Sequence, residues 1–139
     1  MLEGTTFGKT VELLQRSMDV SVMRYGVIAN NVANADVPNF KRSEINFEAS
    51  LKRALDTEKS EPRLQLATSE EGHIASWKRS DWRDVSPRRV LDYLSTSKNN
   101  GNNVDAEQEF MDSMQNQLRY TLMTQAMAFE FNQVNQVLK

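Results

Sequence analysis

Apolar residues recur with helical spacing along the first quarter of the chain. They are Phe7, Val11, Leu14, Met18, Val22, Tyr25, Ile28 and Val32. The seven steps between them span 25 residues, a mean of 3.57 residues per step. This value lies between the heptad period and the period of an ideal helix. The pattern predicts one long helix over residues 7–33, which packs either on its own domain or against other chains.

An asparagine-rich segment, residues 29–41, is expected to end this helix. Asparagine side chains compete for backbone hydrogen bonds, and either Asn34 or Asp36 can terminate the helix. Pro38 restricts the residue before it to an extended conformation. Asn39 tolerates a left-handed backbone better than most residues other than glycine. The segment therefore predicts a helix end followed by a tight turn.

The middle of the chain is rich in charge, because residues 41–93 carry 21 of the 36 charged residues. Apolar residues at helical spacing predict a shorter helix over 44–57, with Ser43 as a possible cap. Leu64 and Leu66 could pair with residues 74–77 as a β-hairpin. Ser86 followed by a proline predicts the start of a short helix that includes residues 90–94. The segment from 95 to 103 reads as a loop or linker by composition.

A second long helix is predicted from Asp105 to about Leu138. Asp105 and Gln108 form a pattern similar to a capping box. The helix carries two apolar rows: Met111, Met114, Leu118, Leu122, Gln125 and Phe129, and Tyr120, Met123, Met127, Phe131, Val134 and Leu138. Two apolar faces predict more than one packing partner.

The polar residues of this helix are mostly amides. Between residues 113 and 138 the only charged side chains are Arg119 and Glu130. A solvated helix face would carry Lys and Glu, whereas amides can hydrogen-bond to neighbouring helices without the cost of burying a charge. We therefore expect the helix to be surrounded in an assembly, and the chain ends to be loose before assembly.

Composition excludes several classes of function. A chain of 139 residues is one domain in size, and it contains no cysteine and one histidine. Thiolate and multi-histidine metal sites are therefore excluded. The net charge of −2 argues against nucleic-acid binding through bulk charge. No apolar run approaches the roughly 20 residues that span a bilayer. The first twenty residues carry five charges, unlike a cleavable signal peptide.

One segment mixes aromatic and basic residues. Trp77, Trp82 and the arginines of 79–89 could form a stacking platform for single-stranded nucleic acid. Asp81 and Asp84 work against phosphate attraction, so the favoured interpretation is a solvated strand or loop whose tryptophans pack on a neighbour. No catalytic residue, cofactor site or metal site is expected anywhere in the chain.

The asparagine-rich segment resembles the N-terminal signature of bacterial flagellar axial proteins. The matching residues are Asn31, Val32, Ala33, Asn34, Pro38, Phe40 and Lys41. Val37 stands where that signature usually has Thr, and Asn39 where it usually has Gly. The C-terminal helix is similar to that of the B-type proximal rod protein family of the flagellar basal body, FlgB. Its opening at 102–111 and the run Asn-Gln-Leu-Arg-Tyr at 116–120 carry this resemblance.

The resemblance implies a mainly α fold. An N-terminal rod helix (1–36) and a C-terminal rod helix (104–139) would pair in a coiled-coil-like bundle. The region between them (37–103) would hold the turn, a short helix, a possible hairpin and a linker. The implied function is that of a structural subunit of the flagellar basal-body proximal rod, without enzymatic activity. Such subunits assemble helically with other rod proteins into the hollow drive shaft of the flagellum.

The resemblance also implies partners and a location. The partners would be copies of the chain, other flagellar rod proteins, and the membrane-ring adaptor and export-gate proteins at the rod base. The chain would reach the periplasmic rod through the flagellar type III apparatus without a cleaved signal peptide. An alternative interpretation of the helices is a cytoplasmic coiled-coil adaptor or secretion chaperone.

An assembly interface is expected on both long helices and on the turn between them. The candidate residues are Leu14, Met18, Val22, Tyr25, Asn31, Asn34, Pro38, Phe40, Met111, Met114, Asn116, Leu118, Arg119, Tyr120, Leu122, Gln125, Phe129 and Asn132.

Overall fold

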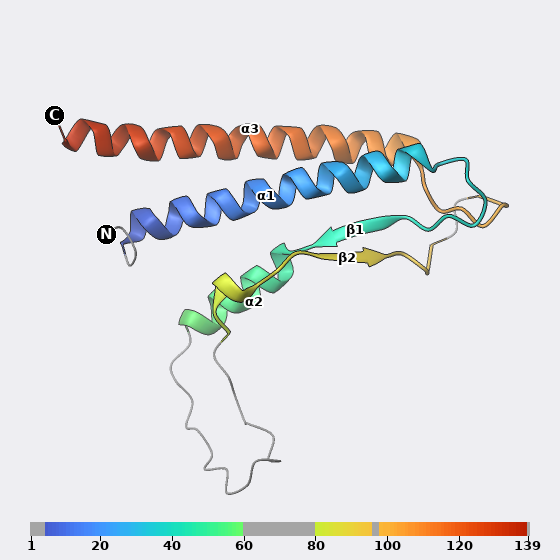
Figure 1. The fold of residues 1–139 in the computed structure, drawn as a ribbon, viewed down its shortest axis with the longest axis horizontal. Coiled ribbons are helices and arrows are strands. Elements are labelled where there is room, and N and C mark those ends of the chain that lie inside the picture. The colour runs from blue at the N-terminus through green and yellow to red at the C-terminus, as the bar shows by residue number, and fades with distance from the viewer. Residues whose placement is uncertain (1–4, 60–79, 96–97, 139) are drawn as a thin grey trace, which may run out of the picture. The chain divides into compact units, whose positions relative to one another are not determined.

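The computed structural model describes residues 5–59, 80–95 and 98–138. These residues form three α-helices, one short 3-10 helix and one two-stranded sheet (Figure 1). In chain order the elements are α1 (Thr6–Ala33), β1 (Ser43–Asn46), α2 (Glu48–Lys59), η1 (Trp82–Asp84), β2 (Arg88–Leu91) and α3 (Ala106–Val137).

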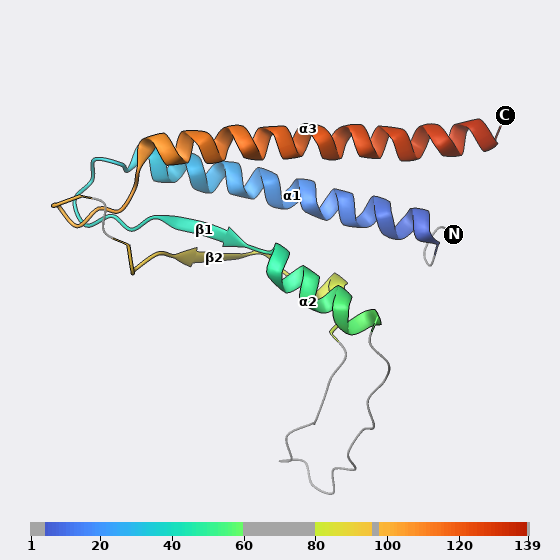
Figure 2. The same ribbon diagram turned by 180° about the vertical axis from the view of Figure 1, so that it is seen from behind.

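The two long helices pair in antiparallel fashion, and they lie side by side in both Figure 1 and Figure 2. The rings of Phe7 and Phe131 meet edge to face with centroids 5.7 Å apart. Further along, Asn116 Nδ2 donates to the carbonyl oxygen of Ser21 at 2.8 Å. The start of α1 thus meets the end of α3. This confirms the predicted mainly α fold with paired terminal helices.

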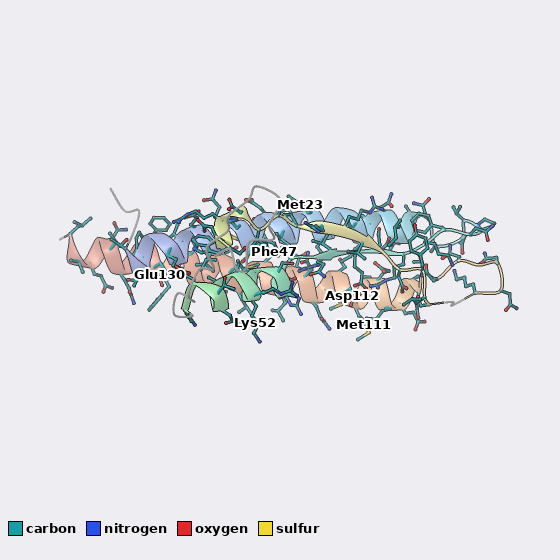
Figure 3. All side chains as sticks on the ribbon, turned by 90° about the horizontal axis from the view of Figure 1, so that it is seen from below. Met23, Phe47, Lys52, Met111, Asp112 and Glu130 are labelled. Atoms are coloured by element: carbon teal, nitrogen blue, oxygen red, sulfur yellow. The ribbon has the colours of Figure 1, made fainter. Side chains whose placement is uncertain are left out.

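One face of α3 packs against α1. The buried or half-buried residues of α3 are Glu109, Asp112, Ser113, Asn116, Met123, Met127, Glu130 and Val134. Apart from Asp112, they are spaced three, four or seven apart, the heptad spacing of a coiled-coil seam. Of the two predicted apolar rows, the second therefore faces α1. The first row is exposed, and Figure 3 shows Met111 on the side of α3 remote from α1.

The ends of the long helices follow the prediction closely. The hydroxyl of Thr5 accepts from Gly8 N at 3.1 Å and caps α1. The helix ends at Asn34, whose side chain donates to the Asn30 carbonyl at 2.7 Å. These bonds satisfy backbone groups that the helix leaves unpaired at its ends.

The start of α3 is also capped as predicted, with one difference. The Asp105 carboxylate accepts from the backbone N–H groups of Glu107 at 2.9 Å and Gln108 at 3.4 Å. The Gln108 side chain donates to Asp112 Oδ1 at 2.9 Å. That amide is therefore used along the helix and does not fold back to the cap as in a capping box.

The predicted short helix is present as α2, but its start and one other local prediction are wrong. The helix predicted over 44–57 begins only at Glu48, and Ser43, read as its cap, starts strand β1. The helix predicted after Ser86 is strand β2. The two strands pair with each other, and Asp92 N donates to the Arg42 carbonyl at 2.8 Å beyond them. Cross-strand pairing thus supplies the backbone partners that local helices would have supplied.

The structure divides into two compact units, one of Asn46–Arg88 and one of the remaining chain. In the described part of the first, α2 packs with η1, and Phe47, Ala54 and Trp82 are buried. The Arg83 guanidinium lies 4.6 Å from the centre of the Trp82 ring. Trp82 is thus not an open stacking platform. The predicted hairpin of 64–66 with 74–77, and Trp77, lie outside the described residues.

Candidate assembly interface

The unit that contains both long helices has two contrasting parts. We use the name joint for residues 30–43, 89–95 and 98–116, where the end of α1 meets the start of α3. We use the name free end for residues 6–18 of α1 and 120–137 of α3. The joint holds most of the buried polar side chains of the described residues, and the free end holds none.

Asn31 links three segments at the joint. Its side chain is fully buried. The Nδ2 atom donates to the Ser43 carbonyl at 2.9 Å and to Glu109 Oε2 at 3.1 Å. The Oδ1 atom accepts from Ser43 N at 3.1 Å. This amide therefore ties α1 to the first residue of β1 and to the first turn of α3.

A buried ion pair lies beside Asn31. The Glu109 side chain is fully buried, and its Oε1 accepts from Arg42 Nε. The same guanidinium pairs with Asp112 Oδ2 at 2.9 Å and with Glu44. A buried carboxylate is stable only when its charge is paired and hydrogen-bonded, and Arg42 and Asn31 supply both conditions.

Asn102 binds the turn that follows α1. Its Nδ2 atom lies 2.8–3.0 Å from the carbonyl oxygens of Asn34, Ala35 and Val37. Its Oδ1 accepts from Val104 N at 2.7 Å. A single buried amide thus satisfies backbone carbonyls of the α1 end and a backbone N–H just before α3.

The neighbouring Asn103 joins the segment after β2 to the same region. Its Oδ1 accepts from Arg42 N at 2.6 Å, and its Nδ2 donates to the Asp92 carbonyl at 2.8 Å. Hydrogen bonds from the Ser95 hydroxyl and from the backbone N–H groups of Ser95 and Leu94 lower the pKa of Asp92. The segment from 92 to 103, read as a loop or linker in part, is therefore tightly held at its ends.

Asn39 adopts the left-handed conformation predicted from the sequence, with φ of 60°. Its backbone N–H donates to the Asn100 carbonyl at 3.0 Å. Gly101 is also left-handed, with φ of 78°, and a Cβ atom there would lie 2.6 Å from Asn39 Oδ1. Lys41 Nζ donates to the Gly101 carbonyl at 2.8 Å. The two turns therefore pack directly against each other.

The free end contrasts with the joint. The first buried residue of α1 is Val20, and the last buried residue of α3 is Asn116. Leu14, Met18, Met123 and Met127 are only half-buried, although they lie on or near the contact between the helices. In this part of the described helices, pairing of two helices leaves every apolar side chain partly in contact with solvent.

The candidate interface residues fall into three groups. Exposed residues are Val22, Tyr25, Pro38, Met111, Met114, Leu118, Arg119, Tyr120, Leu122, Gln125, Phe129 and Asn132. Half-buried residues are Leu14, Met18, Asn34 and Phe40. Asn31 and Asn116 are buried inside the chain, and Asn116 bonds to α1, so these two amides serve internal packing.

The exposed group contains an apolar row on α3 that is interrupted by Gln125, and we name this row the outward row. It consists of Met111, Met114, Leu118, Leu122 and Phe129, each more than half exposed. Sequence reasoning found this row but could not tell which of two rows faced α1. It missed the structural roles of Arg42, Glu109 and Asn102. Glu109 carried a signal only as a negative charge near a helix start.

The arrangement has the character of an assembly subunit. The described residues contain no group of three or more His, Cys, Asp or Glu side chains that could hold a metal ion. None of the described helices is both long enough and apolar enough to cross a membrane. The two terminal helices are joined at one end by buried hydrogen bonds, and one apolar row of α3 is exposed to solvent. This arrangement is typical of a helical structural subunit.

Comparison with known proteins assigns the family. The model of the family described as flagella basal body rod protein matches residues 24–41. A flagellar basal body rod protein FlgB of Borreliella burgdorferi is 45% identical over 134 residues, covering 96% of this chain and 98% of that protein. FlgB of Bacillus subtilis is 31% identical over 134 residues, covering 95% of each. The chain belongs to the FlgB family of flagellar basal body rod proteins.

The matched residues 24–41 coincide with the end of α1 and the turn after it. They include Asn31, which bonds to Ser43 and Glu109, and left-handed Asn39. The resemblance seen in the sequence is therefore confirmed, and its signature residues have structural roles at the joint. Membership of a rod family does not support the adaptor or chaperone alternative.

Proposed function

We propose that the chain is a structural subunit of the flagellar basal-body rod and packs against neighbouring subunits through the outward row of α3. Membership of the FlgB family supports the rod assignment. The observation that carries the packing mode is the row itself, in which five large apolar side chains are each more than half exposed. Extended apolar patches of this kind are typical of interaction surfaces.

The surroundings of the row support the same proposal. Arg119 and Glu130 are the only charged residues between 113 and 138. Gln125, which lies within the row, and its amide neighbours can bond to an adjacent helix. A neighbouring subunit can therefore cover most of α3 without burying unpaired charge, which would be the main cost of such a contact.

The free energy gained by burying the outward row favours assembly through several contacts. Covering the exposed part of each large apolar side chain is worth roughly 1–2 kcal/mol. Association also costs several kcal/mol in lost translational and rotational freedom, on the order of 4–15 kcal/mol. One row on one neighbour therefore gives weak pairing, whereas contacts to several neighbours in a rod add together.

The finer assignments belong to the same proposal. The chain occupies the proximal part of the periplasmic rod and assembles helically with copies of itself and other rod proteins into a hollow shaft. Membrane-ring adaptor and export-gate proteins contact it at the rod base. It is exported unprocessed through the flagellar type III apparatus. Intact-mass measurement on the chain from isolated basal bodies tests the last point, since a cleaved chain would be lighter than 15.9 kDa.

Two adjacent substitutions test the proposed interface. Leu118 and Gln117 are both exposed on α3, but only Leu118 lies in the outward row. Leu118→Asp should abolish rod assembly and swimming, because it places a bare charge in a packed layer. Gln117→Asp adds the same charge and should be tolerated far better.

The readouts are swimming, the number of basal bodies seen by electron microscopy, and the amount of soluble chain in the cell. Normal basal bodies in Leu118→Asp cells would contradict the proposed interface. Equal loss of assembly in both variants, with soluble chain present, would show that the row has no special part in the contact.

A further inference from the structure

A second exposed apolar stripe lies on α1. It consists of Val22, Tyr25, Ala29 and Val32, which are spaced by three, four and three residues. Val22 is 61% exposed, Tyr25 55% and Val32 45%. Their neighbours Ser21, Ile28 and Asn31 are buried, so the stripe lies outside the buried face of α1. We name these four residues the α1 stripe.

The α1 stripe matches one half of the outward row in length. The stripe spans 11 residues, and the half from Met111 to Leu122 spans 12. At about 1.5 Å per residue, both are roughly 15–18 Å long. The two surfaces cannot meet within one chain, because the outward row lies on the side of α3 opposite the seam with α1.

We propose that the α1 stripe of one copy packs against the Met111–Leu122 half of the outward row on a second copy. This inference rests on the proposed function and adds which surfaces meet. The contact joins two different surfaces, so it is head-to-tail. A contact of this kind continues from copy to copy and yields a helical stack when the rotation between copies does not close a ring.

The amount of apolar surface that becomes covered favours contact between the α1 stripe and the outward row over contact between two outward rows. A symmetric contact between two outward rows closes at a dimer and leaves both α1 stripes in solvent. Head-to-tail contact covers the stripe and the facing half-row of every copy inside a stack. Of these two surfaces, only the stripe at one end of the stack and the half-row at the other then remain exposed, and growth continues there.

Charge also favours the pairing. Arg24 is the only charged residue between 22 and 32, and Asp112 and Arg119 are the only ones between 111 and 122. Arg24 donates to the Ile45 carbonyl at 3.5 Å, and Asp112 pairs with Arg42 at 2.9 Å. The side chains of Arg24 and Asp112 are therefore engaged inside the chain, and none of the eight residues of the two facing surfaces is charged.

The area predicts a weak individual contact. Four side chains on each copy, most of them about half exposed, bury on the order of 800 Å² in total, below the roughly 1,200–2,000 Å² of a stable specific interface. A purified pair should therefore not persist at micromolar concentration. The contact should form mainly where the rod holds the copies in place.

The chain contains no cysteine, so cysteine cross-linking can test the contact in assembled rods. Cells co-express Tyr25→Cys and Leu118→Cys variants of the full chain, and brief copper–phenanthroline oxidation follows. A disulfide forms only when the two Cα atoms lie within about 7 Å. We expect a product of twice the chain mass in the co-expressing cells and at least tenfold less in cells with either variant alone.

A matched control replaces Leu118→Cys with Gln117→Cys, which is also exposed but lies outside the row. It should give little product with Tyr25→Cys. If a variant prevents swimming, Val22→Cys with Met114→Cys serves as a second pair on the same two surfaces.

Two results would overturn the inference. One is strong self-cross-linking of Leu118→Cys alone, which indicates row-against-row contact. The other is no mixed product from either pair in cells that swim normally. The second result leaves the proposed function intact, because the rod has then assembled through other surfaces.

Discussion

The joint and the free end belong to the same helix pair but are held together by opposite means. At the joint, buried Asn31, Asn102 and Glu109 have hydrogen-bond partners within the chain. At the free end, Met123 and Met127 remain half-exposed on the face toward α1. The joint therefore fixes the register of the two helices in the single chain, whereas the free end and the outward row are the surfaces that we propose neighbouring subunits cover.

The difference follows from the nature of the two interactions. Buried hydrogen bonds are directional and need donors and acceptors in set positions, so they fix the register of α1 against α3. Apolar contacts are not directional and accept any surface of suitable shape. A rod subunit must fold in one way and then pack against several neighbours. Such a subunit benefits when its directional hydrogen bonds and its exposed apolar surfaces are separate.

The largest effect on stability is expected at Glu109. Glu109→Ala removes the carboxylate that pairs with Arg42 and accepts from Asn31. Removing one partner of a buried pair costs about 3–5 kcal/mol. Urea unfolding of the purified chain should show this loss.

Glu107→Ala is the control for this change, because Glu107 lies in the same helical turn but is exposed. It should cost below about 1 kcal/mol, the scale of a charge near a helix start. Equal losses for the two variants would mean that the buried network does not hold the joint.

The next largest effect is expected at Asn102. Asn102→Ala leaves the carbonyls of the turn after α1 and the Val104 N–H without their partner. Unsatisfied buried groups cost about 1–3 kcal/mol each, and partial access of water should limit the total to about 2–4 kcal/mol. Exposed Asn99→Ala should change stability by less than about 0.5 kcal/mol. A loss of stability below about 1 kcal/mol for Asn102→Ala would show that the Asn102 side chain does not hold the joint together.

A smaller effect separates two substitutions at Asn39. Asn39→Gly should be neutral or mildly stabilising, because glycine adopts positive φ freely. Asn39→Val should cost about 1–2 kcal/mol, because a β-branched residue resists the left-handed conformation. Thermal unfolding of both variants is the measurement. Equal midpoints would contradict the turn assignment.

Gly101→Ala sharpens this prediction, because its Cβ would lie 2.6 Å from Asn39 Oδ1. The Asn39→Gly change removes that oxygen. Gly101→Ala should therefore cost less stability in the Asn39→Gly background than alone. The same cost in both backgrounds would show that the clash contributes nothing.

The smallest effect on the isolated chain is expected at the free end. Phe129 is 61% exposed, so Phe129→Asp should change the free energy of unfolding by about 0.5 kcal/mol or less. The same substitution should abolish rod assembly while the chain stays soluble. A large loss of stability in the purified chain would show that Phe129 completes the fold of the single subunit.

Sequence reasoning recovered what local chemistry determines. The two long helices, the Asp105 cap, the helix end at Asn34 and the left-handed Asn39 all depend on residues close in sequence. Strands β1 and β2 have four residues each and pair across more than forty residues of chain. Segments of four residues are too short to show a reliable alternation of apolar and polar residues. A serine just before an apolar pattern of helical spacing is therefore interpreted as a helix cap.

The joint could not be derived from the sequence for a related reason. Asn102 and Asn103 stand in a run that is typical of a surface loop, yet both side chains are buried. An amide suits a solvent-exposed turn and a buried hydrogen-bond network equally well. Asn102 and Asn103 become buried only because the turn after α1 packs against them. That packing depends on the whole fold and not on the local sequence.

Hydrogen exchange on the purified monomer tests the separation of the two regions most directly. The hydrogen-bonded backbone amides of 30–43 and 100–116 should be protected, because their hydrogen bonds open only with the joint. Amides of 6–18 and 120–137 should exchange far faster at micromolar concentration. Strong and equal protection across 113–135 in a chain of monomeric mass would contradict the account and indicate a helical domain that is complete without neighbours.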